Sequence, residues 1–431
     1  MDKKKMLAVL IVLILLAAGA GFWSYTHRTE DIILGTGEEG PPPLNVTWDP
    51  IYKFNKQGYE PGLMCDSTGA MYYTAHKNLD DKTSWDYLAS WFFMSTDNGK
   101  SWNSPSDPFP RGSKWKTYVG DEGDIGVDAQ DRVYFVDTYL LDNHLHVWAD
   151  QGQWQYSERV QKSGGLDDRP WISAQGDKIL QYIGNNAVEV RGGRYWYYRS
   201  TNGGRTWETS IPVPGNGWAL VDAERYGEHA YIISESEVDA PADILLYRTE
   251  DSGVTWNWND PIVIAHRDGP GREYPVVSAG ANGTVYALWN DATNGTENGT
   301  QIFVGWSSDY GLTWNYTNVT PFQGFFDYPM LNVGLDGSLG VAFYGTDDLP
   351  VSAESEWYIL GAMQRDAIDG PLDLNFSRAD PSPVYVGSDL HALHDFFEIV
   401  VTPDGYLNIA YQYYIGPENG HSELYFVRGT V

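Results

Sequence analysis

The stretch Ser95-Thr-Asp-Asn-Gly-Lys-Ser-Trp102 stands at the first of four similar places along the chain. The other copies are Ser200-Thr-Asn-Gly-Gly-Arg-Thr-Trp207, Thr249-Glu-Asp-Ser-Gly-Val-Thr-Trp256 and Ser307-Ser-Asp-Tyr-Gly-Leu-Thr-Trp314. Each copy suits a hairpin turn, because the hydroxyl and the Asp or Asn oxygen accept turn amides, glycine takes positive φ, and tryptophan anchors the next strand. Four such turns, with β-patterned sequence between them, indicate a repeated β-module.

The spacing of the tryptophans gives the size of the module. Trp102, Trp154, Trp207, Trp256 and Trp314 follow one another at intervals of 52, 53, 49 and 58 residues. This period suits a four-stranded propeller blade. The copy that ends at Trp154 is decayed, since it is one residue too short and lacks the hydroxyl.

A second repeat opens each module with a short apolar strand, a tight turn and another apolar or aromatic strand. Examples run over residues 61–73 and 274–286, and the repeats together predict seven modules between about residues 44 and 431. The seventh module ends after a third strand at Glu423 to Arg428. We expect Asn45 to Trp48 to supply its outer strand, because Trp48 lies 54 residues before Trp102, in phase with the repeat. Such closure removes an exposed sheet edge.

The repeated octapeptide resembles the Asp box of sialidases and related β-propellers. The positions that carry the resemblance are Asp97, Gly99, Trp102, Asn202, Gly204, Trp207, Asp251, Gly253, Trp256, Asp309, Gly311 and Trp314. The resemblance implies an all-β, seven-bladed propeller with Asp-box turns over residues 44–431. It covers nearly the whole of that range for the fold, and fold alone does not imply function.

Composition agrees with many short strands and turns and limits the partners. The chain has 46 Gly, 23 Pro and 15% aromatic residues, and its formal net charge is −30. This charge argues against nucleic acid or anionic lipid as a partner, because phosphate binding needs a basic surface. The single cysteine, Cys65, excludes an intramolecular disulfide framework, and we expect it to be a small buried residue.

The N-terminus predicts export of the propeller. Three lysines precede an apolar run from Met6 to Trp23, so residues 1–26 read as cytoplasmic lysines with a transmembrane anchor, or as a cleaved signal peptide. Residues 27–43 then form a polar stalk. The anchor predicts a single-pass protein of the cell membrane with the propeller outside, and the signal peptide predicts a secreted one.

Seven N-x-S/T sequons agree with an extracellular glycoprotein. They lie at Asn45, Asn282, Asn294, Asn298, Asn315, Asn318 and Asn375. The alternative is that Asn, Gly and Thr are simply common in turns.

The topology of a propeller selects the candidate functional residues, because inner-strand starts and second-strand ends meet at one mouth of the central channel. At the inner-strand starts we expect Glu60, Glu122, Asp124, Asp168, Arg169, Arg272, Glu273, Tyr274, Asp327, Tyr328, His391, His394 and Asp395. Near the second-strand ends we expect His76, Asp137, Glu235, Asn290, Asp291, Asp347 and Tyr413. The acidic members either bond to amides of the neighbouring blade, or bind Ca²⁺ or take part in catalysis.

The resemblance to sialidases implies specific catalytic roles, since that family uses three arginines, a tyrosine nucleophile paired with a glutamate, and an acidic proton donor. The matching candidates here are Arg169, Arg272, Glu273, Asp327 and Tyr328. The family's Arg-Ile-Pro signature is absent near the first blade, and no third arginine can be assigned. A clamp for a sialic-acid carboxylate is therefore incomplete.

Histidines form two further groups. His391, His394 and Asp395 are close enough in sequence to bind a transition metal, although a loop of hydrogen-bonded polar residues is the simpler interpretation. His144 and His146 alternate on one strand face and are expected to be an exposed pair. No resident cofactor is expected, with Ca²⁺ the one ion considered.

The sequence leaves two functions open. The first is an extracytoplasmic, membrane-anchored, monomeric propeller that binds a glycan or a surface protein. The second is a sialidase-like glycoside hydrolase, whose acidic mouth would disfavour sialosides.

Overall fold

The computed structural model describes residues 46–77, 88, 90–105, 123–138, 143–149, 153–160, 167–186, 195–215, 217–237, 241–267, 275–292, 299–365, 367, 372–416 and 422–431. The expected anchor and stalk lie outside these residues. Within the described part of the chain, no helix is long and apolar enough to cross a membrane.

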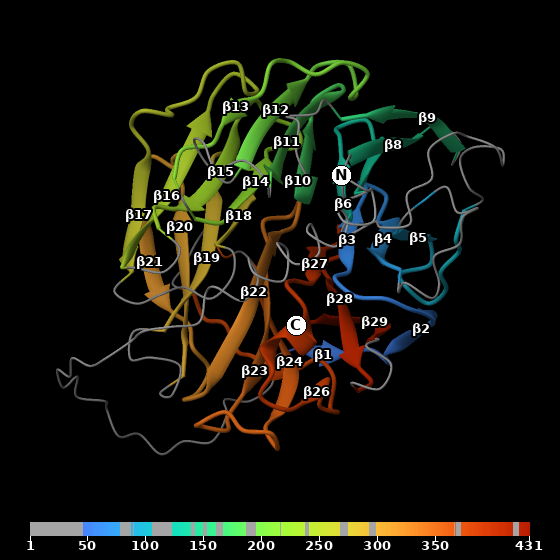
Figure 1. Cartoon of the computed structure of the whole chain (residues 1–431), viewed down its shortest axis with the longest axis vertical. Helices are drawn as coiled ribbons and strands as arrows, with labels where there is room; N and C mark the ends of the chain where they lie inside the picture. Colours follow the sequence, from blue (N-terminus) through green and yellow to red (C-terminus); the bar gives the residue numbers. More distant parts are fainter. Residues whose placement is uncertain are drawn as a thin grey trace, which may run out of the picture. The chain divides into compact units, whose positions relative to one another are not determined.

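Seven antiparallel sheets surround a central axis in the part of the chain that the structure describes (Figure 1). Blade 1 contains β3 (Gly62–Cys65), β4 (Met71–His76) and β5 (Ser90–Ser95). Blade 2 contains β6 (Gly123–Val127), β7 (Val133–Thr138), β8 (Asn143–Ala149) and β9 (Gln153–Arg159). Blade 3 contains β10 (Asp167–Gln175), β11 (Ile179–Asn186), β12 (Tyr195–Ser200) and β13 (Ile211–Pro212).

The remaining four sheets continue the same order from the axis outward. Blade 4 contains β14 (Ala219–Ala223), β15 (Ala230–Glu235), β16 (Ala242–Thr249) and β17 (Ile262–Arg267). Blade 5 contains β18 (Val276–Ala279), β19 (Val285–Asp291), β20 (Gln301–Ser307) and β21 (Asn315–Asn318). Blade 6 contains β22 (Phe325–Val333), β23 (Leu339–Thr346), β24 (Glu356–Gln364), β25 (Ser377–Arg378) and β26 (Tyr385–Val386). Blade 7 contains β27 (Glu398–Val401), β28 (Leu407–Tyr414) and β29 (Ser422–Thr430), and the 3-10 helix η3 (Leu390–Leu393) precedes it.

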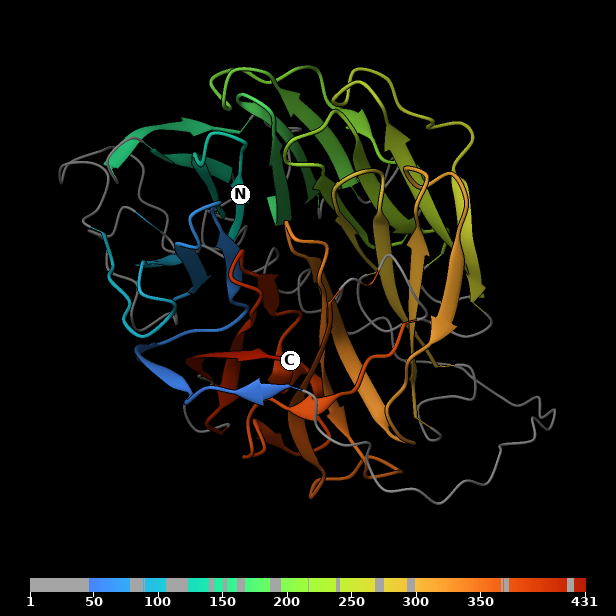
Figure 2. The same cartoon turned by 180° about the vertical axis from the view of Figure 1, so that it is seen from behind.

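The predicted closure of the ring is confirmed. Strands β1 (Thr47–Trp48) and β2 (Tyr52–Gln57) both pair antiparallel with β29, so the start of the chain forms the outer edge of blade 7 (Figure 2). The Trp48 indole Nε1 also donates a hydrogen bond to Ser377 Oγ in blade 6 at 2.8 Å. The outer edge is longer than expected, since pairing continues to Gln57.

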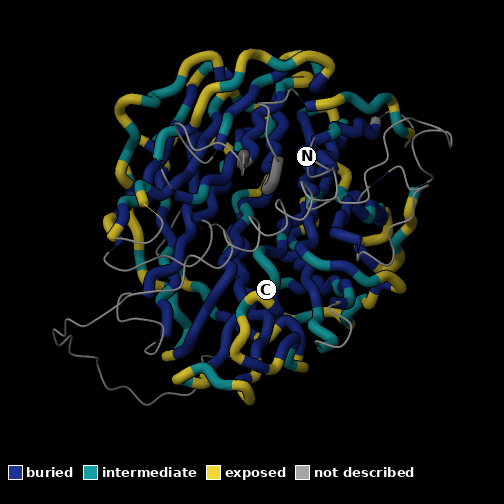
Figure 3. The backbone as a smooth tube through the Cα atoms, viewed as in Figure 1, coloured by how far each residue is buried: buried dark blue, intermediate teal, exposed yellow. Residues whose placement is uncertain are grey.

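The inner strands form a closed circle around the channel. Each of β3, β6, β10, β14, β18, β22 and β27 contacts the next, and β27 contacts β3. Burial falls from the axis outward (Figure 3). Every residue of β4, β7, β15, β19 and β23 is buried, whereas β13 is exposed and β21 is mostly so. Second strands lie between two neighbouring sheets, which explains their continuous apolar runs.

The four repeated turns share one hydrogen-bond pattern. In the blade 5 copy, Ser307 Oγ accepts from Gly311 N at 2.9 Å, and Asp309 Oδ1 accepts from Thr313 N at 2.8 Å. The equivalent bonds recur in the copies around Asp97, Asn202 and Asp251. Each turn is thus closed by its own side chains, as the sequence predicted.

The glycine of each repeated turn meets two requirements at once. Gly99, Gly204, Gly253 and Gly311 all have positive φ, between 76° and 86°. A Cβ on each would also collide with the preceding blade, for example with Phe426 of blade 7 at Gly99. The turns therefore join neighbouring blades as well as neighbouring strands.

Candidate functional site at the start mouth

We call the end of the channel where the inner strands begin the start mouth, and the opposite end the end mouth. Five catalytic candidates were predicted at the start mouth. Asp327 and Tyr328 are described and belong to β22. Arg169 belongs to β10, but its side chain lies outside the described residues, as do Arg272 and Glu273 entirely. The structure therefore gives side-chain positions for only two of the five candidates, Asp327 and Tyr328.

Asp327 and Tyr328 lie at an irregular point of β22. The register with β23 shifts between Asp327 and Met330, and Tyr328 has a φ of 52°. Asp327 is fully buried, and its Oδ1 accepts from Tyr328 N at 3.1 Å. Tyr328 Oη donates to Leu390 O of η3 at 3.4 Å, and its ring lies edge-on to Tyr344. Both side chains hold the bend of the strand in place, and their catalytic roles stay a prediction.

A second group of predicted residues comes together at the seam between blades 7 and 1. His76 Nε2 lies 3.1 Å from Glu60 Oε2, and Glu60 Oε1 accepts from Asp395 N at 3.0 Å. The centroid of the Tyr59 ring lies 4.3 Å from the ring centroids of both His76 and His394. A buried carboxylate beside an imidazole is a pair suited to proton transfer.

The predicted histidine and aspartate cluster after β26 does not form a metal centre. His391 is exposed, whereas His394 faces Ser422 Oγ at 3.3 Å, and burial lowers the pKa of His394. Among the described residues, no group of three or more His, Cys, Asp or Glu side chains is placed to hold a metal ion.

Buried ionisable side chains reach the start mouth from other blades too. In blade 2, Asp137 Oδ1 accepts from Ser90 N at 3.0 Å and Asp137 Oδ2 lies 3.8 Å from His146 Nε2. In blade 4, Arg267 pairs with Glu235 and is only 1% exposed. His146 was expected to be exposed, and this expectation is wrong: it is buried, and desolvation lowers its pKa well below the usual value.

Inside the channel, polar side chains connect each inner strand to the next. Backbone N–H groups of one strand donate to a side chain of the preceding strand in six of the blade junctions. These pairs are Leu63 with Glu398, Ile172 with Asp124, Ala223 with Ser173, Ala279 with Asp222, Val333 with Ser278, and Val401 with Asn332. Two roles were expected for the acidic residues at the inner-strand starts. For Asp124, the hydrogen bond to an amide of the neighbouring blade is confirmed.

Two buried carboxyl groups interact across blade 1. They belong to Glu398 of blade 7, whose Oε2 accepts from Leu63 N of blade 1, and to Asp124 of blade 2. Burial raises the pKa of Asp124 to about 6, and burial together with the charge of Asp124 raises the pKa of Glu398 well above its usual value. We therefore expect the two carboxyl groups to titrate as a pair.

The sequence predictions did not include Glu398 or Asp222. A signal was present, because each is a single acidic residue inside an apolar inner strand, as in Val221-Asp222-Ala223 and Phe397-Glu398-Ile399. Such residues point into the channel when the neighbours on either side face the blades.

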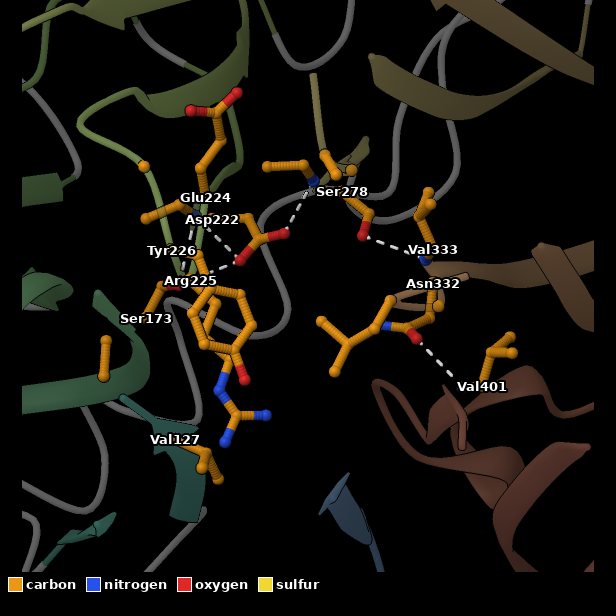
Figure 4. A pocket seen from close by; sticks show the side chains of 18 of the residues that line it. Val127, Ser173, Asp222, Glu224, Arg225, Tyr226, Ser278, Asn332, Val333 and Val401 are labelled. Carbon is orange, nitrogen blue, oxygen red and sulfur yellow. Dashed lines mark hydrogen bonds between the residues drawn. The ribbon is translucent and has the colours of Figure 1, made fainter. Parts of the chain in front are cut away.

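The end mouth holds a pocket of about 350 Å³ (Figure 4). The C-terminal ends of all seven inner strands line it, together with Tyr310 from a repeated turn. This pocket was not predicted.

Comparison with known proteins identifies the fold alone. No protein-family model matches the chain, and no curated protein matches it. A fungal alcohol oxidase of the AA5 family in complex with copper has a TM-score of 0.54 and 11% identity, covering 89% of this chain and 76% of its own. An ulvan lyase of polysaccharide lyase family PL25 has a TM-score of 0.52 and 11% identity, and the alignment covers 86% of this chain and 94% of the lyase. The NanB sialidase of Streptococcus pneumoniae is less similar, with a TM-score of 0.43 and 12% identity. The alignment covers 88% of this chain and 70% of the sialidase.

Proposed function

We propose that this chain is an Asp-box propeller of sialidase-like architecture and that it hydrolyses a glycosidic bond at the start mouth. The observation that carries the proposal is the concentration of buried ionisable groups there. Glu60 with His76, Asp137 with His146, and Glu235 with Arg267 come from different blades. Buried ionisable pairs are common at functional sites, which supports chemistry on this side of the propeller.

The reaction needs two groups on opposite sides of the scissile bond. In our proposal Asp327 or Asp168, as the protonated acid, gives its proton to the leaving oxygen while the glycosidic C–O bond breaks and Tyr328 Oη bonds to the anomeric carbon, with Glu273 taking the tyrosine proton. Water then cleaves the bond between the sugar and Tyr328, which releases the free sugar and returns the proton to Tyr328. Arg169 and Arg272 would orient hydroxyl groups of the substrate.

The substrate we propose is a neutral glycoside. The formal net charge of −30 and the acidic side chains at this mouth oppose a substrate carboxylate. Two arginine candidates do not complete a carboxylate clamp. Sialosides should therefore be poor substrates.

A second candidate function is glycan binding without turnover. The full burial of Asp327 and the near-complete burial of Tyr328 favour it, because buried side chains in a strand bend are the ones expected of a structural role. For both functions we propose export, with the apolar run from Met6 to Trp23 as a membrane anchor. The sequons Asn282, Asn315 and Asn318 are exposed on the propeller, as N-glycan attachment requires.

The test is an assay of the purified chain against neutral glycosides and sialosides. We expect turnover of a neutral glycoside, reduced at least ~100-fold in kcat by Glu273→Gln, because removal of one member of a catalytic pair has an effect of that order. Glu250→Gln is the matched control, since Glu250 is exposed in a repeated turn at the other mouth. Saturable glycan binding without turnover would instead establish the binding function.

A further inference from the structure

The pocket at the end mouth lies at the other end of the channel from the proposed site of hydrolysis. Its walls are the turns that follow three inner strands, at residues 224–227 in blade 4, 280–282 in blade 5 and 334–335 in blade 6. Its volume of about 350 Å³ lies within the range of small-molecule sites. The size suits one ring of a sugar rather than a long chain.

Arg225 forms a fixed wall of this pocket. Its guanidinium crosses toward blades 1 and 2, where Nε donates to Asp128 O at 2.9 Å and Nη1 donates to Cys65 O at 3.3 Å. Nη2 pairs with Asp131. All three nitrogens are thus used within the protein, so Arg225 is not left to bind an anion.

Exposed hydrophobic side chains gather at the pocket. Tyr226 is 59% exposed, Leu335 is 43% exposed and Tyr310 is 37% exposed, and all three line it. The ring of Tyr310 is held by stacking on His229, with a centroid separation of 4.1 Å. Figure 4 shows the ring of Tyr226 beside Arg225, across the pocket from Asn332. Aromatic faces that remain in water at a concave site are typical of binding surfaces.

The floor of the pocket offers neutral polar groups. Asn332 Oδ1 accepts from Val401 N at 2.9 Å, and no hydrogen bond from its Nδ2 is found within the described residues. Asp222 also lines the pocket, but Ser173 Oγ, Ala223 N and Ala279 N, at 2.8 to 2.9 Å, already donate to its two oxygens. The floor therefore presents an amide donor rather than an uncompensated charge.

We propose that the end mouth is a second ligand site, which binds one ring of a neutral sugar. The apolar face of the ring stacks on Tyr226 or Tyr310, and a ring hydroxyl accepts from Asn332 Nδ2. Anionic ligands are disfavoured, because Asp222 and Glu224 line the pocket while the charge of Arg225 is used by Asp131. This site is independent of hydrolysis at the start mouth.

The experiment measures binding of a panel of methyl glycosides of neutral sugars by ligand-observed NMR. Protein made without N-glycans is used, since Asn282 is both a sequon and part of the pocket. We expect saturable binding with a dissociation constant on the order of 1 mM, weakened at least ~10-fold by Tyr226→Ala. Tyr316→Ala, which removes an equally exposed tyrosine (51%) from outer strand β21, should leave binding unchanged.

The Asn332→Ala variant tests whether the amide on the pocket floor binds the sugar. Its melting temperature is recorded as well, because Asn332 also accepts a hydrogen bond from Val401 N. Tyr226→Ala is the decisive variant, since its exposed ring is not needed for folding. Binding that survives Tyr226→Ala, or a preference for uronic acids or tetramethylammonium over neutral glycosides, would overturn the proposal. Binding that is lost in Tyr226→Ala while Glu273→Gln retains it supports the proposal, whether or not the chain hydrolyses glycosides.

Discussion

The two mouths of the channel are built from different kinds of residue. At the end mouth, the repeated turns are closed by their own hydroxyl and carboxylate groups, and their glycines pack against the preceding blade. At the start mouth, the described residues include buried pairs such as Glu60 with His76 and Glu235 with Arg267. The repeated turns thus satisfy their own polar groups, whereas the buried pairs at the start mouth join residues that are farther apart in the sequence.

This difference explains how one repeat can support both stability and function. The repeated turns join the blades without using the start mouth, so residues there are free to vary. The comparison predicts that substitutions in the repeated turns mainly affect folding, whereas those at the start mouth mainly affect chemistry.

The largest effect on stability is expected at a repeated-turn glycine. Gly99→Ala places a Cβ into the ring of Phe426 and forces a non-glycine residue into positive φ. We expect a loss of about 3 kcal/mol in the free energy of unfolding, from overpacking and backbone strain together. Denaturant unfolding measures it.

The matched control is Gly69→Ala. Gly69 has a φ of 86° but no atom within 4 Å of the added Cβ, so only the backbone cost of about 1 kcal/mol remains. Equal losses in the two variants would show that the turns do not join the blades as described.

The carboxyl pair between the two mouths should make stability depend on pH. The raised pKa values of Asp124 and Glu398 mean that the folded state holds protons that the unfolded chain has released. The contribution of these protons to the free energy of unfolding is therefore lost as the pH rises. The loss begins at about pH 4, where the unfolded groups titrate, and continues through about pH 6 and above. Glu398→Gln should melt higher than the parent near neutral pH and show a smaller decline over this range.

Glu354→Gln serves as the control for this experiment, because Glu354 is an exposed glutamate. Its melting temperature should follow that of the parent at every pH. A Glu398→Gln variant with the same decline as the parent would contradict the raised pKa values of this pair.

The smallest effect is expected at a turn carboxylate. Hydrogen bonds from Thr313 and Ser307 lower the pKa of Asp309 to about 2, against the effect of burial. Its stabilisation is present above the unfolded pKa of about 4 and is lost as the pH falls through about 2. Asp309→Ala should cost about 1 kcal/mol at neutral pH, by loss of the turn hydrogen bonds.

Asp309→Asn should cost less, because in the natural copy Asn202 Oδ1 accepts the equivalent bond from Thr206 N and Asn202 Nδ2 donates to Thr206 Oγ1. Thermal unfolding at neutral pH and near pH 3 separates the two variants. A larger loss for Asn than for Ala would contradict the assigned role.

Most of the fold could be predicted from the sequence because the turns are local. The period of the tryptophans and the phase of Trp48 predicted both the seven blades and the closure by β1. The sequence did not show that β2 continues the outer edge, since its register depends on pairing with β29 far away in the chain. For Cys65, burial was predicted and is confirmed, and it raises the pKa of the thiol to about 12.

The candidate sites were less predictable, because they depend on which residues meet across blades. Glu60 and His76 were each placed at the start mouth, but their pairing was not foreseen. Arg225 and Tyr226 look like ordinary turn residues in the sequence, and only the fold brings them to the end mouth. The interaction of Asp124 with Glu398 likewise depends on two blades that are far apart in the sequence.

The division of roles between the two mouths is tested most directly by one paired measurement on a neutral glycoside. The rate of hydrolysis of this glycoside is compared in the parent chain, in Glu273→Gln, whose residue is predicted to act at the start mouth, and in Tyr226→Ala at the end mouth. Our account predicts that Glu273→Gln lowers kcat at least ~100-fold, whereas Tyr226→Ala leaves kcat within about twofold. Hydrolysis that persists in Glu273→Gln but is abolished by Tyr226→Ala would contradict it.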